Sequence, residues 1–135
     1  MIFVFISNCT ILNAQSALDQ FNIENANNST EKPIKVSLRK LYNNPEKYNG
    51  KVISVTGFMI IEFEGTAIYD TKNRNRKNKT NLKYWLMMSK KDIHKLEGEC
   101  THKYATVIGQ FNRNIKGHFG MFNGCIMNIR NIELK

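Results

Sequence analysis

The chain has 135 residues, of which 41% are hydrophobic and 10% aromatic. This composition supports one packed core, excludes an intrinsically disordered chain, and leaves no room for a second core of ordinary size. The 20 Lys and Arg residues outnumber the 11 Asp and Glu residues. The resulting net charge of +9 attracts polyanions such as nucleic acid, anionic lipid headgroups or acidic glycans, without defining a site.

Residues 1–15 predict a signal-like export segment. They carry no charged side chain, and the apolar run Ile2–Ile6 is too short to span a bilayer but fits the apolar region of a secretory signal, with cleavage after Ala14. The Lys or Arg that usually opens such a signal is missing, so the alternative is an apolar N-terminal strand packed on the domain. We expect a periplasmic or secreted protein with no transmembrane span in the mature chain.

A cysteine inside this segment offers a second outcome of export. The run Ile6–Cys9 resembles a bacterial lipobox, in which the cysteine becomes lipidated, although Asn8 replaces the usual small residue. We rank cleavage after Ala14 above a lipid anchor at Cys9. Cleavage there leaves Cys100 and Cys125 in the mature chain.

Residues 16–33 are rich in Asn, Ser, Thr and Glu, and we interpret them as a polar linker. The folded domain is then expected over residues 34–135. It begins with a short helix over Ser37–Tyr42, because Ser37 is a good N-cap and apolar residues follow at helical spacing. A turn over Pro45–Gly50 ends this helical stretch.

The run Lys51–Gly65 predicts one long strand. Ile53, Val55, Met59, Ile61 and Phe63 alternate with polar residues and define a core face. Gly57 lies on that face and allows the bend that barrel closure requires.

Four shorter strands complete the prediction, with a helical turn between the third and fourth strands of the set. The strands are expected at Thr66–Tyr69, Lys83–Ser89, Lys103–Phe111 and Cys125–Leu134. Five strands and one short N-terminal helix predict an all-β domain, a five-stranded OB-like β-barrel.

The two mature cysteines are expected to remain free. If the fourth and fifth strands pair antiparallel, with Phe111 near Gly124 and Tyr104 near residues 130–131, Cys100 and Cys125 lie roughly 20 Å apart. A disulfide requires Cα atoms within about 7 Å.

Five short motifs occur in the chain, at Ser37–Leu41, Asn44–Lys51, Val55–Gly57, Glu62–Gly65 and Gly117–Gly124. In this order they resemble a group of small exported bacterial proteins with OB-like domains. The resemblance covers most of the chain from Val36 to Glu133, and it implies the fold and the location but no activity and no catalytic residue. The basic loop after the second strand departs from the group.

That loop, Lys72–Lys79, carries five positive charges and no negative one, and aromatic residues flank it. A basic groove with stacking aromatics is how OB-folds bind single strands. The alternative is a solvated loop whose aromatic neighbours belong to the core. The candidate ligand contacts here are Arg74, Arg76, Lys77, Tyr84 and Trp85.

The loop Gly117–Gly124 contains three glycines in eight residues, which indicates unusual backbone angles or close approach. In an OB barrel the loop between these strands lines the ligand groove, so His118, Phe119 and Phe122 are the best candidates for contacts. Alternatively, the two phenylalanines cap the barrel and His118 binds a backbone carbonyl.

No catalytic signature, phosphate loop or dinucleotide fingerprint occurs, and the histidines lack the spacing of a zinc site. The sequence therefore predicts a non-catalytic, monomeric binding module of the bacterial envelope with no cofactor or metal. Its expected partner is a protein or an anionic envelope component. The first alternative is an OB-fold single-stranded nucleic-acid-binding protein, and the second is a hydrolase using Glu62, Glu64 or His118.

Overall fold

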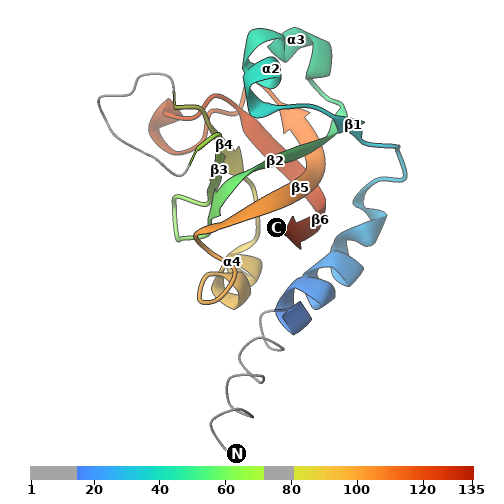
Figure 1. The fold of residues 1–135 in the computed structure, drawn as a ribbon, viewed down its shortest axis with the longest axis vertical. Coiled ribbons are helices and arrows are strands. Elements are labelled where there is room, and N and C mark those ends of the chain that lie inside the picture. The colour runs from blue at the N-terminus through green and yellow to red at the C-terminus, as the bar shows by residue number, and fades with distance from the viewer. Residues whose placement is uncertain (1–14, 72–80) are drawn as a thin grey trace, which may run out of the picture.

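The computed structural model describes residues 15–71 and 81–135, which contain a closed, mixed five-stranded β-barrel (Figure 1). Its strands follow the order β2-β3-β4-β6-β5, and antiparallel pairing of β5 with β2 closes the barrel. β4 and β6 run parallel, and every other neighbouring pair in the barrel is antiparallel. The strands are β2 (Val52–Ile60), β3 (Ala67–Tyr69), β4 (Lys83–Leu86), β5 (Lys103–Asn112) and β6 (Cys125–Leu134).

Short elements surround the barrel. The two-residue strand β1 (Ile34–Lys35) pairs parallel with β2. Helices α2 and α3 lie at one end of the barrel, and α4 connects β4 to β5 at the other (Figure 1). The helices are α2 (Leu38–Asn43), α3 (Pro45–Tyr48) and α4 (Lys90–Leu96), with 3-10 turns η1 (Ala26–Asn28) and η2 (His118–Gly120).

The predicted first helix is confirmed. The Ser37 hydroxyl accepts a hydrogen bond from the Lys40 amide at 3.1 Å, as an N-cap should. Leu38 and Leu41 are buried, and so is Tyr48, the last residue of the short helix α3. The predicted positions of the barrel strands are also confirmed within a few residues.

The long strand β2 ends at Ile60, five residues earlier than predicted. The chain turns at Glu62, whose carbonyl accepts hydrogen bonds from the Thr66 hydroxyl at 2.7 Å and the Gly65 amide at 3.2 Å. The placement of Phe63 on the core face was therefore wrong. Its side chain lies on the turn and is 62% exposed.

Gly57 is required by close packing on the core side of β2. A Cβ atom at this position would collide with the Tyr69 carbonyl oxygen and approach Leu38 Cδ1 to 3.0 Å. The missing side chain lets β2 lie directly against β3 and α2. This contact explains the glycine in addition to the bend that the sequence predicted.

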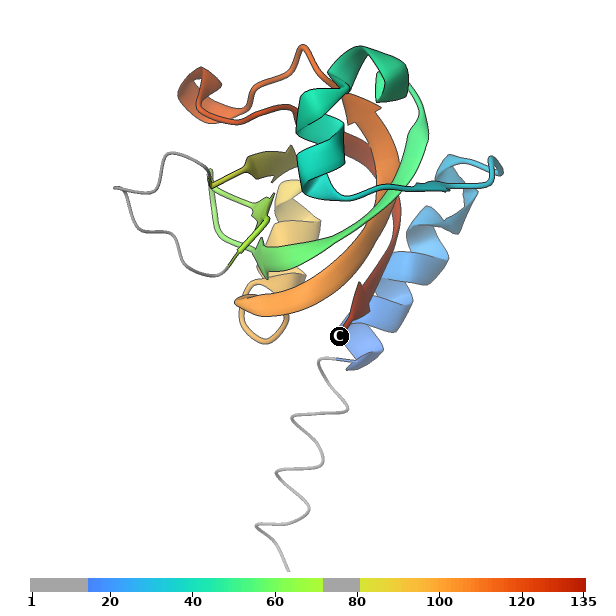
Figure 2. The same cartoon turned by 45° about the horizontal axis from the view of Figure 1, so that its top comes forward.

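The prediction of a linker over residues 16–33 does not hold for its first part. Residues 15–25 are helical, and Leu18 and Phe21 are buried in the core. The helix runs beside β6 in both ribbon views (Figures 1 and 2). The expected signal segment, including Cys9, lies almost entirely outside the described residues.

Amide side chains from this segment cover the edge of β6 that β4 leaves unpaired after Ile126. The Asn22 amide nitrogen donates to the Ile132 carbonyl at 3.0 Å, and the Ile132 amide donates to the Asn22 oxygen at 2.8 Å. Asn28 donates to the Ile129 carbonyl at 3.0 Å. The helical segment therefore replaces a neighbouring strand, and it satisfies backbone groups that would otherwise be unpaired.

The antiparallel pairing of β5 with β6 is confirmed, but its register differs from the prediction. Phe111 pairs with Ile126, and the Lys135 amide donates to the Tyr104 carbonyl at 2.9 Å. A register shift between Ile108 and Gln110 accounts for part of the difference, because a bulge cannot be placed from alternation alone.

No disulfide joins Cys100 to Cys125, as predicted, and both thiols are buried. Burial raises the pKa of both thiols, that of Cys125 to about 11. Both groups therefore remain protonated near neutral pH and pack as small apolar side chains.

Candidate functional site

The candidate site is built on the connection between β5 and β6, residues 113–124. Reciprocal hydrogen bonds tie its end to β4: the Asn123 amide donates to the Lys83 carbonyl at 2.8 Å, and the Lys83 amide donates to Asn123 Oδ1 at 2.9 Å. The Phe122 amide closes the loop by donating to the Lys116 carbonyl at 2.9 Å. The base of the loop is thus fixed to the barrel.

An aromatic cluster packs under the loop. The rings of Phe122 and Trp85 meet edge to face with centroids 5.1 Å apart, and the His118 ring lies 6.5 Å from Trp85. Phe122 is 9% exposed, so it anchors the loop on the barrel, which agrees with the capping role considered from the sequence. Lys83 Nζ lies 5.0 Å from the centre of the Phe122 ring. Trp85 is half-buried beneath this cluster.

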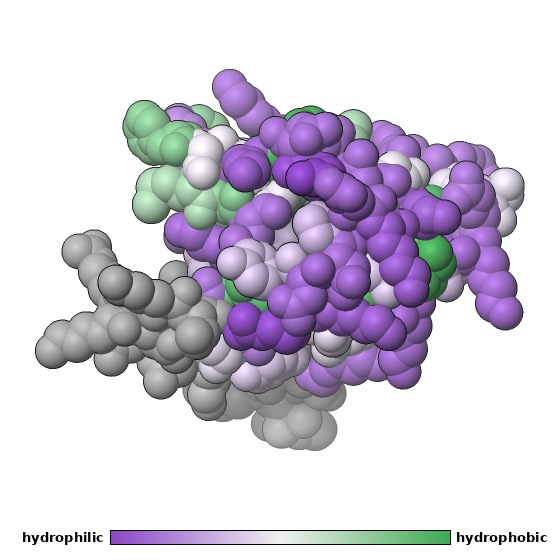
Figure 3. All heavy atoms as spheres, turned by 90° about the horizontal axis from the view of Figure 1, so that it is seen from above, coloured by the Kyte–Doolittle hydropathy of each residue, from purple (hydrophilic) through white to green (hydrophobic). Residues whose placement is uncertain are grey.

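The tip of the loop projects large apolar side chains into solvent. Phe119 is 85% exposed and Met121 is 61% exposed. Phe119 has φ 58° and Gly120 has φ 64°, so the tip is held in the left-handed region, where a bulky residue is uncommon. The space-filling view shows hydrophobic atoms gathered on the corner that this loop forms (Figure 3).

The turn between β2 and β3 borders the loop. His118 Nε2 lies 3.8 Å from Glu64 Oε2, and Phe63 is exposed next to Glu64. Lys90 Nζ lies 5.8 Å from the centre of the Phe63 ring. The contact between His118 and Glu64 thus joins the β5–β6 loop to the β2–β3 turn. These two connections carry three exposed apolar side chains, those of Phe63, Phe119 and Met121.

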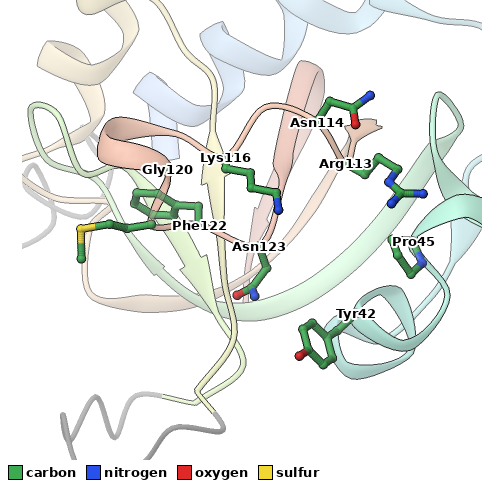
Figure 4. A pocket seen from close by; sticks show the side chains of 9 residues that line it. Tyr42, Pro45, Arg113, Asn114, Lys116, Gly120, Phe122 and Asn123 are labelled. Atoms are coloured by element: carbon green, nitrogen blue, oxygen red, sulfur yellow. The ribbon is translucent and has the colours of Figure 1, made fainter.

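A pocket of about 390 Å³ lies between the loop and the start of α3 (Figure 4). Two of the residues that line it are cationic, Arg113 and Lys116, and none of the described lining residues is acidic. Arg113 also forms an ion pair with Glu46 at 3.0 Å. The lining consists of Tyr42, Pro45, Arg113, Asn114, Lys116, Gly120, Met121, Phe122 and Asn123.

The structure brings together four of the predicted site residues and separates one. His118, Phe119, Phe122 and Trp85 form the loop cluster just described. Tyr84 points to the opposite face of β4: it is buried, and its hydroxyl donates to the Leu38 carbonyl at 3.2 Å. Tyr84 therefore presents no exposed surface to a ligand, because strand alternation places Tyr84 and Trp85 on opposite faces.

The basic residues Arg74, Arg76 and Lys77 lie outside the described residues. At the base of their loop, Asp70 Oδ1 accepts a hydrogen bond from the Leu82 amide at 3.0 Å. Asp70 also lies 3.3 Å from Arg39 on α2. These contacts fix the points where the described chain leaves β3 and enters β4.

Arg113 and Lys116 were missed by the sequence reasoning. Both lie between the predicted fourth strand and the glycine-rich loop, a position that could have marked them. Tyr42 and Pro45 carried no such signal, since their part in the pocket depends on how α2 and α3 pack on the barrel.

Within residues 15–71 and 81–135, no group of three or more His, Cys, Asp and Glu side chains is placed to hold a metal ion. Over the same residues, no helix combines the length and the apolar character needed to cross a bilayer. No protein-family model and no curated protein matches this chain.

Proposed function

We propose that the protein is a non-catalytic binding module of the bacterial envelope, and that it contacts its partner through the loop between β5 and β6. The observation that carries the proposal is the exposure of Phe119 on a loop whose base is fixed by the buried Phe122. An exposed apolar group held in a strained backbone conformation is typical of a contact surface.

The strand order of the barrel supports this assignment, because we interpret the barrel as OB-like. Numbered within the barrel, the strands follow the order 1-2-3-5-4-1, and α4 connects the third strand to the fourth. OB-folds bind ligands on the face of strands two and three and on the loops between strands one and two and between strands four and five. The corresponding positions here carry Trp85, Phe63 and Phe119.

The signal-like composition of residues 1–15 supports location in the envelope, in the periplasm or outside the cell, with an anchor at Cys9 as the variant outcome. The partner is a protein or an anionic envelope component, because the chain carries a net charge of +9 and two cations line the pocket beside the loop. We expect the module to act as a monomer.

Cell fractionation tests the location. We expect the protein in the envelope or the medium, with mass spectrometry of the mature chain giving Gln15 as the first residue. A mature chain that begins with a lipidated Cys9 would show that the protein is exported but anchored by a lipid. A cytoplasmic protein that retains Met1 would contradict export.

The proposed surface is tested by cysteine protection in intact envelopes. Phe119→Cys should react with a maleimide more slowly in the envelope than in the purified protein, because the partner covers it. Ile23→Cys, at a 76% exposed position on the N-terminal helix, is the control and should react equally in both states. Equal labelling of position 119 in both states would contradict the proposal.

The alternative function is single-stranded nucleic-acid binding, favoured by the position of Trp85 on the ligand face of the proposed OB barrel. It requires affinity for oligonucleotides that falls steeply with salt, and that drops further when Arg74, Arg76 and Lys77 are replaced by Ala. Binding without salt dependence, or no binding, would exclude this alternative.

A further inference from the structure

We propose that the partner of the β5–β6 loop is an anionic phospholipid surface. In this arrangement Phe119 and Met121 enter the bilayer interface, and a lipid phosphate occupies the pocket beside Arg113 and Lys116. The inference rests on the proposed function, and it names the chemistry of the partner at the same loop.

Contiguity of apolar and cationic groups is the first argument. Met121 belongs both to the exposed tip and to the lining of the pocket, so no gap separates the two. Figure 4 shows Lys116 and Arg113 reaching into the space between the loop and Pro45. Apolar side chains next to Lys and Arg are the combination that binds proteins to the interface of anionic membranes.

The charge around the pocket is the second argument. Glu46 pairs with Arg113, but none of the described lining residues is acidic, and Lys116 has no ion pair among the described residues. Asn114 and Asn123 add polar groups to the wall. A phosphate diester with a single negative charge therefore meets an excess of positive charge and polar side chains.

The shape of the aromatic cluster favours lipid over nucleic acid. Stacking of successive bases needs a row of accessible rings. Tyr84 is buried, and Phe122 and His118 pack on Trp85, so β4 and the adjoining loop present no such row. The partly exposed rings of Phe58 and Tyr104, with centroids 5.3 Å apart, lie on β2 and β5 instead. The exposed rings of Phe63 and Phe119 and the exposed thioether of Met121 lie on the two connections, where a bilayer can receive them.

Vesicle flotation tests the inference on the protein as isolated. Vesicles of equal parts phosphatidylglycerol and phosphatidylcholine should carry the protein upward, and vesicles of phosphatidylcholine alone should not. The variant Phe119→Ser/Lys116→Gln removes one apolar group and one cation from the site. Its partition into the anionic vesicles should fall at least about tenfold, since one interfacial cation alone contributes about fivefold.

The matched control is Ile23→Ser/Lys32→Gln, which loses the same charge and an exposed apolar side chain on the N-terminal segment, away from the loop (Figure 1). Its partition should equal that of the unmodified protein. Phe119→Trp should retain binding, and its emission should shift to shorter wavelength on anionic vesicles only. Equal losses in the two double variants, or equal flotation with both vesicle types, would overturn the inference.

The result also separates this inference from the proposed function. If position 119 is protected in the envelope but the protein does not float with anionic vesicles, the loop binds a partner of another class. The lipid assignment is then wrong, and the binding surface stands.

Discussion

Gly117 lies so close to Trp85 that a Cβ atom on the glycine would come within 2.5 Å of the indole Cε3 atom. The same Cβ would come within 2.5 Å of Phe122 Cδ2. Gly117 also has φ 67° and ψ −161°, a backbone conformation that essentially glycine alone adopts. This contact fixes where the loop leaves the barrel, and therefore where Phe119 and the pocket lie.

Gly117→Ala should destabilise the protein by about 3 kcal/mol, because the new methyl group adds a collision to an unfavourable backbone conformation. The fluorescence of Trp85, the sole tryptophan, should report a changed environment in the folded state. Denaturant titration measures the free energy of unfolding.

Gly120→Ala is the matched control, because Gly120 also has positive φ but, among the described residues beyond its two chain neighbours, no heavy atom lies within 4 Å of the position of its Cβ. It should cost only about 1 kcal/mol, the backbone contribution alone. Equal costs at the two positions would contradict the packing of Gly117 against Trp85.

Tyr84→Phe should lower the free energy of unfolding by about 1 kcal/mol, since it removes the buried hydrogen bond to the Leu38 carbonyl. It should leave vesicle binding unchanged, because the ring and the surface loop keep their positions. Thermal or denaturant unfolding together with flotation checks both parts. A loss of binding at unchanged stability would restore Tyr84 as a ligand contact.

Cys125 should make stability depend on alkaline pH. Burial raises the pKa of its thiol from 9.0 to about 11, so the folded protein holds this proton more tightly than the unfolded chain. The contribution of Cys125 is fully present below pH 9 and is lost as the pH rises through 11. Burial also raises the pKa of Tyr84, which acts in the same direction at higher pH.

Denaturant midpoints between pH 8 and pH 11 measure this decline, and Cys125→Ala should make it shallower. In the folded protein at pH 8, Cys100 and Cys125 should resist a thiol reagent and react after unfolding, since both are buried. Rapid labelling of the native protein at Cys125 would show that the barrel does not enclose it.

Asn22→Ala should release the N-terminal helix from β6 at a cost of about 2 kcal/mol, because it removes two hydrogen bonds with the Ile132 backbone. Hydrogen exchange should accelerate over residues 15–25 and at the Ile132 amide. Gln20→Ala is the control, since Gln20 is exposed and bonds only Glu24 among the described residues. Unchanged exchange in the Asn22 variant would contradict the docking of this helix.

The barrel could be predicted from the sequence because its signals are local. Alternation along β2 and β5, the N-cap at Ser37 and the strand β6 each follow from adjacent residues. The N-terminal helix could not be predicted in this way. Its apolar signal is little more than Leu18 and Phe21 in an Asn-rich segment, and its partner Ile132 lies 110 residues from Asn22.

The site was predictable in part for the same reason. The glycines of residues 117–124 indicated the loop. Trp85 could be named as a candidate contact because it lies on a predicted strand. The inward orientation of Tyr84 required the register of β4, which the sequence alone did not determine. The pocket depends on how α3 is placed beside the loop. Pro45 and Arg113 are far apart in the sequence and line the same pocket only in the folded chain, so the sequence could not predict it.

Photo-crosslinking in bacterial cells that produce the protein shows whether this loop is the contact surface. Benzoylphenylalanine replaces Phe119 in one variant and Ile23 in the control. We expect a crosslinked product at position 119 and none at position 23, and the mass of the adduct distinguishes a lipid from a protein. No product at position 119, or the same products at both positions, would contradict this proposal.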